Sequence, residues 1–167
     1  MSTFVSVGNA KQPFRRLLDA IAHLAPSLPQ PVIVQHGHTP FASTACQITA
    51  FMGMEEFAHH VKTAELLILH AGAGSVIHAI EADKCPVVMP RRANLGEHVN
   101  DHQIEFARTL AEAGKVVVAD GPEHLGGAIT AVLGQGKQPG ATMTADRSEL
   151  RMVNLVSETL ADYACHL

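Results

Sequence analysis

The sequence predicts an α/β domain with a mainly parallel sheet flanked by helices. Three observations lead to this fold class: short apolar runs of strand length recur along the chain, helical patterns separate them, and glycine-containing or polar loops follow several of the runs. Alternating strands and helices are typical of a single Rossmann-like sheet. We expect this domain at residues 1–133, a linker or loop at 134–146 and a C-terminal helix at 147–167.

The first third of the chain predicts two strands joined by a helix, then a third strand and a short helix. Pro13 opens the first helical pattern, and the prolines that follow Ala25 end it because proline lacks a backbone N–H. Glu55 and Glu56 fall in the first turn of the second helical pattern, where the helix dipole favours negative charge. The expected elements are strands at 4–7, 32–34 and 46–51 and helices at 13–25 and 54–62.

Residues 66–103 form the unit around which the rest of the chain is organised. The expected order is a strand at 66–69, a glycine turn at 70–75, a helix at 76–82, a strand at 87–89 and a polar loop that ends at 103. A helix at 101–113, a strand at 116–118 and a helix at 122–133 complete the domain. Ligands of open parallel sheets bind at the carboxyl ends of the strands. We therefore expect the binding loops in this unit.

The turn at 70–75 predicts a diphosphate cradle. Gly72 and Gly74 lack a Cβ, so the backbone can approach a ligand closely. Ser75 is placed to cap the next helix, His70 adds a donor, and a helix N-terminus suits a phosphate. The glycines alone would fit a ligand-free turn equally well, and the polar cluster at 100–103 favours the ligand site.

Composition excludes several classes of function. Hydrophobic residues make up 47% of the chain and charged residues 17%, which favours a sizeable core, and a net charge of −4 gives no basic signature for nucleic acid. The three cysteines include no CxxC pair and are interpreted as reduced cytosolic thiols. No signal peptide or membrane span is expected. The eleven histidines include no HExxH motif, so no metal site is predicted.

Other site chemistries fit the motifs less well. A dinucleotide site needs GxGxxG after the first strand, a P-loop needs GK[ST], and a hydrolase elbow needs GxSxG, none of which the sequence contains in place. Arg91 and Arg92 could clamp a phosphate or a uronic acid carboxylate, or form a solvated basic pair. Asp101 and Gln103 could hold sugar hydroxyls, and Asp101 could equally act as a helix N-cap.

Three motifs together resemble a known family: HAGAGS at 70–75, KCPVVMPRR at 84–92 and GEHVNDHQ at 96–103. They are similar to the C-terminal, donor-binding domain of family 28 glycosyltransferases, the MurG-type group, in which this domain is half of a GT-B fold. The likeness covers about residues 4–119. It is strongest to the small soluble subunits of two-component transferases, which include the PssE-like group and the catalytic subunit of the dolichol-pathway UDP-GlcNAc transferase.

The resemblance implies a UDP-sugar site with a role for each loop. His70 and the turn would face the diphosphate, the segment at 51–52 would pair with uracil, the loop at 100–103 would hold the donor sugar, and the loop at 8–9 would face the domain cleft. Many relatives place a ribose-binding Glu where this chain has His78. The implied site residues are Gly8, Asn9, Phe51, Met52, His70, Gly72, Ala73, Gly74, Ser75, Arg91, Asn100, Asp101 and Gln103.

The resemblance also implies an activity. The chain would be the donor-binding catalytic subunit that moves a sugar from a UDP-sugar to a lipid-linked saccharide, with inversion, without a cofactor and without an essential metal. A membrane-associated subunit would bind the acceptor and supply the base, which places the chain in the cytoplasm or at the inner face of the membrane. Without that partner the chain could self-associate. The alternatives are a stand-alone nucleotide-binding or regulatory module and a homo-oligomeric nucleotide-sugar enzyme.

Overall fold

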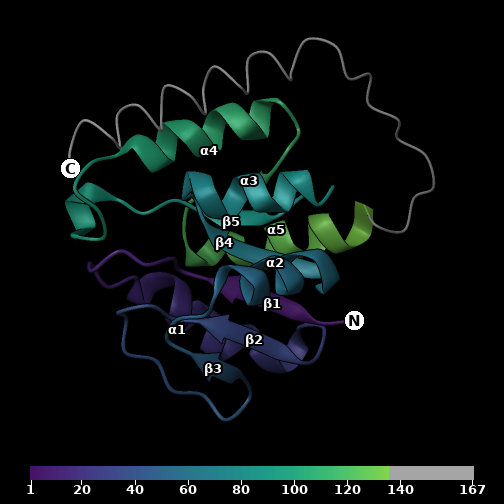
Figure 1. Cartoon of the computed structure of the whole chain (residues 1–167). Helices are drawn as coiled ribbons and strands as arrows, with labels where there is room; N and C mark the ends of the chain where they lie inside the picture. Colours follow the sequence, from purple (N-terminus) through teal and green to yellow (C-terminus); the bar gives the residue numbers. More distant parts are fainter. Residues whose placement is uncertain (136–167) are drawn as a thin grey trace.

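A six-stranded sheet lies between two layers of helices (Figure 1) in the computed structural model, which describes residues 1–135. The strands are β1 (Thr3–Ser6), β2 (Val32–Gln35), β3 (Gln47–Thr49), β4 (Leu66–His70), β5 (Val87–Met89) and β6 (Val117–Val118). The helices are α1 (Arg15–Leu24), α2 (Met54–Thr63), α3 (Ala73–Glu81), α4 (His102–Glu112) and α5 (Pro122–Gln135), with 3-10 turns η1 (Ala25–Ser27) and η2 (Ala93–Leu95).

The strand order of the sheet is β3-β2-β1-β4-β5-β6, and each of its five strand pairs is parallel. In the register of the central strands, Val5 of β1 lies opposite Val34 of β2 and Ile68 of β4. The chain builds the sheet outward from β1 to β3, then returns to the other side of β1 and builds outward from β4 to β6. This doubly wound order confirms the predicted Rossmann-like fold class and puts the switch point between β1 and β4.

The core has two parts because side chains alternate between the two faces of each strand. Val5 and Ile68 pack with α1 and α5 in one cluster, whereas Phe4 and Leu69 pack with α2, α3 and α4 in the other. Both faces of β1 and β4 are buried, as is usual for parallel strands. The carboxyl ends of these two strands are therefore held rigidly side by side.

Two elements, α3 and β3, differ most from the bounds that the sequence predicts. Helix α3 begins at Ala73 instead of 76, because Gly72 has the extended conformation of an N-cap and its carbonyl accepts a hydrogen bond from Val76 at 3.1 Å. Ser75 therefore lies in the first turn of α3 and is not its cap. Strand β3 spans only Gln47–Thr49, because it lies at the sheet edge and pairs only with β2.

Helix α5 reaches Gln135, the last described residue, which is two residues beyond the predicted end of the domain at 133. The part of the predicted linker from residue 136 to 146 and the whole predicted helix at 147–167 lie outside the described residues. In residues 1–135, no helix combines the length and the apolar character that crossing a membrane requires.

Candidate functional site

A cavity of about 350 Å³ opens at the switch point of the sheet, where the loops after β1 and β4 meet. Parallel sheets bind ligands at this place because the two loops diverge to opposite faces and leave a crevice between them. The residues that line the cavity are Gly8, Asn9, Gln35, Met52, Met54, Phe57, His70, Gly72, Ala73, Gly74, Ser75 and His78.

The N-terminus of α3 forms one wall of this cavity. Gly72 caps the helix without a side-chain hydrogen bond, and Ala73, Gly74 and Ser75 form the first turn. The first backbone N–H groups of a helix have no partner within the helix, and the dipole adds partial positive charge at the same end. This wall is suited to an anionic group, and binding of a diphosphate at the glycine turn stays a prediction.

His70 forms the floor between the two loops. It ends β4, it is only 9% exposed, and its Nδ1 lies 3.4 Å from the carbonyl oxygen of Ser6 on β1. Burial and, secondly, the positive charge of Arg91 lower the pKa of His70 to about 3, although the hydrogen bond to Ser6 opposes this shift. The ring is therefore neutral at physiological pH. Because the ring is neutral, the expected hydrogen bond from His70 to a diphosphate would not come from a charged donor.

Two glycines are required by the position of the His70 ring. A Cβ on Gly8 would lie 2.5 Å from Cε1 and Nε2 of His70, and Gly8 also has a φ of +72°. A Cβ on Gly72 would overlap the same ring edge at Nε2. In contrast, a Cβ on Gly74 would meet nothing within 4 Å. Gly8 and Gly72 thus let both loops close directly onto the imidazole.

A buried polar network orients Asn9 at the opposite wall. The Ser6 hydroxyl donates to Oε1 of Gln35 at 2.8 Å and accepts from the backbone N–H of Gly8 at 3.2 Å. Gln35 Nε2 then donates to Oδ1 of Asn9 at 3.2 Å. Because Oδ1 of Asn9 is the acceptor in this network, its Nδ2 is the amide group that Asn9 can offer as a donor to a ligand.

The rest of the wall is largely apolar. Met52 lies just before α2, and Met54 is the first residue of this helix. The ring centroid of Phe57, also on α2, lies 6.0 Å from that of His78 on α3. Nδ1 of His78 lies 3.7 Å from a carboxylate oxygen of Glu81. Such an apolar wall next to a helix N-terminus can accommodate the nucleoside part of a nucleotide.

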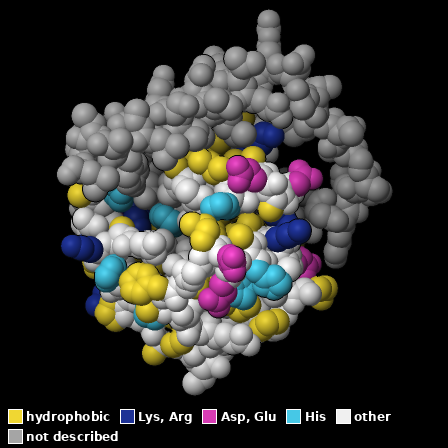
Figure 2. Space-filling view, in the orientation of Figure 1, with side chains coloured by type: hydrophobic (Ala, Val, Ile, Leu, Met, Phe, Trp, Pro, Cys, Tyr) yellow, Lys and Arg dark blue, Asp and Glu magenta, His cyan; other side chains and the backbone are white. Residues whose placement is uncertain are grey.

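No side chain of Lys, Arg, Asp or Glu lines the cavity among the described residues. On the face that Figure 2 shows, the Lys and Arg side chains of the described part are scattered singly among hydrophobic and His side chains. Across residues 1–135, no group of three or more His, Cys, Asp or Glu side chains is placed to hold a metal ion. The groups that can donate to an anion in the cavity therefore include the helix N–H groups, the Ser75 hydroxyl and the Asn9 amide.

The structure brings together eight of the predicted site residues and separates five others from the cavity wall. Those in the wall are Gly8, Asn9, Met52, His70, Gly72, Ala73, Gly74 and Ser75, and those outside it are Phe51, Arg91, Asn100, Asp101 and Gln103. Phe51 is 48% exposed and packs edge-on against His38, with ring centroids 5.0 Å apart. It therefore lies on the surface next to the cavity residue Met52.

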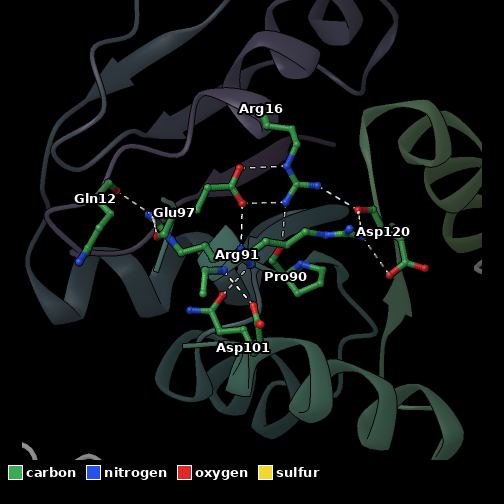
Figure 3. Close-up of polar contacts among 10 residues, drawn as sticks. Gln12, Arg16, Pro90, Arg91, Glu97, Asp101 and Asp120 are labelled. Atoms are coloured by element: carbon green, nitrogen blue, oxygen red, sulfur yellow. Dashed lines mark hydrogen bonds and ion pairs between the residues drawn. The ribbon is translucent and has the colours of Figure 1, made fainter. Parts of the chain in front are cut away.

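The Arg91 side chain is fully buried beside the loop that follows β1 (Figure 3). Its guanidinium donates to the carbonyl oxygens of Val7, Gln12 and Glu97 at 2.7–2.9 Å and lies 4.7 Å from the ring centroid of Phe14. These contacts fix the loop after β1 against the loop after β5. A phosphate clamp by Arg91 would require these hydrogen bonds to break, and the structure supports a positioning role.

An ion pair between Arg16 and Glu97, whose side chains are largely buried, holds the same region (Figure 3). The Glu97 carboxylate accepts two hydrogen bonds from Arg16, at 3.0 and 2.8 Å, and a third from the backbone N–H of Arg92 at 3.0 Å. Arg92 also donates to the carbonyl oxygen of Asp120 at 2.9 Å. The sequence-based alternatives of a clamp or a solvated pair thus missed the structural use of both arginines.

The predicted sugar-binding residues lie on the loop that leads into α4 and in the first turn of that helix. Gln103 is 6% exposed and accepts a hydrogen bond from the backbone N–H of Arg91 at 3.1 Å. Asp101 is the N-cap residue of α4, but its carboxylate accepts from the N–H of Ala93 at 2.9 Å and makes no capping hydrogen bond. Asn100 accepts from the N–H of His102 at 3.3 Å. In this structure these side chains order their own loop.

Four residues of the cavity wall were missing from the predicted site: Gln35, Met54, Phe57 and His78. Gln35 directly follows the predicted strand at 32–34, which is a sequence signal for a polar side chain at the carboxyl edge of the sheet, but the pairing of β2 with β1 that brings it to the cavity is known only from the fold. His78 was identified only as a departure from relatives. Met54 and Phe57 carry no sequence signal beyond helical spacing, because only the fold turns α2 toward the cavity.

The chain folds as a doubly wound α/β domain with a cavity at its switch point, and comparison with known proteins assigns its family. The model of the glycosyltransferase family 28 C-terminal domain matches residues 3–158, so the chain belongs to this family. The chain is 33% identical over 79 residues to the UDP-N-acetylglucosamine transferase subunit ALG13 of Yarrowia lipolytica. This alignment covers 47% of the chain and 38% of that protein.

Two solved structures share the fold. The glycotransferase of kitacinnamycin superposes with a TM-score of 0.63 at 17% identity, over 96% of this chain and 39% of that one. The glycosyltransferase SnogD from Streptomyces nogalater superposes with a TM-score of 0.54 at 17% identity, over 98% of this chain and 43% of that one. The chain thus spans less than half the length of these relatives, as expected for half of a GT-B fold.

Proposed function

We propose that this chain is the donor-binding subunit of a UDP-sugar-dependent glycosyltransferase. The observation that carries the proposal is the switch-point cavity, in which the N-terminus of α3, the loop after β1 and His70 converge. Membership of the family 28 C-terminal domains and the likeness to a protein named as a UDP-N-acetylglucosamine transferase subunit support the same reading.

The parts of a nucleotide sugar can be assigned to parts of the cavity. The diphosphate would meet the N–H groups of the first turn of α3, where Gly74 and Ser75 lie, and the nucleoside would lie toward Met52 and Phe57. Gln103 and its loop lie beside the backbone of Arg91, outside the cavity wall. Contact between this loop and the sugar would therefore need the sugar to extend out of the cavity.

The acceptor side of the reaction belongs to the proposal as well. The described residues bring no carboxylate into the cavity wall, so the base that deprotonates the acceptor would come from outside this domain. We propose a membrane-associated subunit that holds a lipid-linked saccharide above the cavity, in polysaccharide or glycolipid synthesis at the cytoplasmic face. The likeness to a protein named as a transferase subunit supports dependence on a partner.

Calorimetric titration of the purified chain with UDP, UDP-GlcNAc, UDP-glucose, UDP-glucuronate, ATP and NAD tests the proposal. We expect binding that is selective for uridine and that needs the diphosphate, so uridine alone should bind far more weakly. The variant Ser75→Ala should keep the fold, since its side chain makes no capping hydrogen bond. Preference for ATP or NAD would instead support a nucleotide-binding module of another kind.

Measuring the turnover of a UDP-sugar distinguishes the proposed donor-binding subunit from a homo-oligomeric nucleotide-sugar enzyme and from a regulatory module. The proposal expects the chain alone to bind UDP-GlcNAc without transferring its sugar, and to gain transfer activity with a co-purified acceptor-binding subunit. Turnover by the isolated chain would favour a homo-oligomeric nucleotide-sugar enzyme. Binding without any activity in the presence of the partner would favour a regulatory module.

A further inference from the structure

The ring of His70 has a fixed hydrogen-bonding direction. Its Nδ1 faces the carbonyl oxygen of Ser6 at 3.4 Å, and a carbonyl oxygen can only accept, so Nδ1 carries the hydrogen. In the neutral ring Nε2 then has a lone pair and no hydrogen. Nε2 of His70, which lies in the cavity wall, is therefore a hydrogen-bond acceptor and not a donor.

This lone pair lies where the diphosphate is expected. The Nε2 edge faces both Gly8 and Gly72, since a Cβ on either glycine would overlap it. Gly72 is the cap of α3, whose N–H groups form the anion-binding wall. A phosphate oxygen that is held by this wall would meet an unprotonated nitrogen, and two acceptors that face each other repel.

The charged groups around His70 determine whether its ring can hold a second proton. Arg91, from the segment after β5, and His98, from the loop before α4, both disfavour a proton on His70 in the empty cavity. His78 on α3 is the other titratable side chain in the cavity wall, and no titratable side chain of β1 or β2 lines it. A diphosphate brings two negative charges into a site whose wall has no Lys or Arg among the described residues.

We propose that a nucleotide sugar binds this cavity together with one proton, and that Nε2 of His70 takes up that proton. This inference rests on the proposed function. The imidazolium would donate from Nδ1 to Ser6 and from Nε2 to a diphosphate oxygen. As an acceptor oxygen bonds to the sugar carbon and gives its proton to a base outside this domain, the bond between that carbon and the diphosphate oxygen breaks. The electron pair of the broken bond stays on the diphosphate, and the imidazolium faces the added negative charge.

The shift that a diphosphate can cause in the pKa of His70 is large enough for proton uptake near neutral pH. The pKa of His70 is about 3 in the empty cavity. One opposite charge within about 4–6 Å moves a pKa by roughly 1–3, and the diphosphate brings two such charges. The occupied cavity can therefore hold His70 protonated at pH values where the empty cavity holds it neutral.

Calorimetric titration with UDP-GlcNAc at pH 7 in two buffers of different ionisation enthalpy measures the protons bound. The diphosphate of UDP-GlcNAc is esterified at both ends, so it lacks the ionisation near pH 6 of a phosphate monoester. We expect an uptake that approaches one proton. The affinity should fall as pH rises from 6, by up to tenfold per pH unit, until the pKa of the occupied state is passed.

Two variants assign the proton. His70→Asn keeps an N–H that can donate to Ser6 but has no titratable ring, so proton uptake should be lost. His78→Gln removes the other titratable side chain of the wall, and uptake should persist. Binding of UDP-GlcNAc without uptake, or uptake that is lost in His78→Gln and kept in His70→Asn, would overturn the inference and leave the proposed function standing. Absence of binding would overturn both.

Discussion

The low pKa of His70 makes the stability of the protein depend on pH. In the unfolded chain the imidazole titrates near its ordinary pKa of 6.5, whereas in the fold the pKa is about 3. Below pH 6.5 the unfolded chain therefore gains a proton that the folded chain does not. Stability falls as pH drops from about 6.5 toward 3. At pH 5 this coupling removes about 2 kcal/mol relative to pH 7, at 1.36 kcal/mol per pH unit.

Urea denaturation at pH 7 and pH 5, for the parent and for His70→Asn, tests this coupling. Other histidines also titrate, so the quantity to compare is the loss of unfolding free energy between the two pH values in each protein. The parent should lose about 2 kcal/mol more than His70→Asn. His124→Asn, at an exposed position, serves as the matched control and should behave like the parent. An equal loss in the parent and in His70→Asn would refute the buried, neutral state of His70.

Two further pairs of variants test the structure around the cavity. Gly72→Ala should weaken UDP-GlcNAc binding by at least about tenfold in calorimetry, because the new Cβ displaces the His70 ring. Gly74→Ala should leave stability unchanged or raise it by up to about 1 kcal/mol in denaturation, since its Cβ has room. Glu97→Ala should destabilise by about 3 kcal/mol in denaturation by removing the carboxylate partner of the largely buried Arg16, whereas Glu56→Ala, at an exposed carboxylate, should change stability by less than about 0.5 kcal/mol.

Local patterns in the sequence predicted most of the fold. The strands around Val5 and Ile68 are buried on both faces and are bounded by glycine or polar loops, so their apolar runs identify them. Boundaries were less predictable where a cap decides them. Helix α3 begins at Ala73 because Gly72 takes the extended cap conformation, and a serine three residues later is an equally good cap by composition.

The glycine turn was predictable because it is contiguous with its strand and helix. Gln35 reaches the cavity only because β2 pairs with β1, a contact between distant segments that residue spacing does not reveal. Arg91 shows the opposite case. A pair of arginines beside a polar loop suggests anion binding, yet the fold brings the carbonyl oxygens of Val7 and Gln12 to its guanidinium and buries it. Long-range partners decide between binding and structural roles.

The most direct test of the account is to map where UDP-GlcNAc binds, by following backbone amide resonances of the isotope-labelled chain during a titration. The account predicts that the largest shifts occur at the loop after β1 and at the first turn of α3, at Gly8, Gly72, Gly74 and Ser75. Surface amides such as that of His124 should not move. Saturable shifts that cluster away from the switch point, or no shifts at millimolar UDP-GlcNAc, would contradict the assignment of this cavity as the donor site.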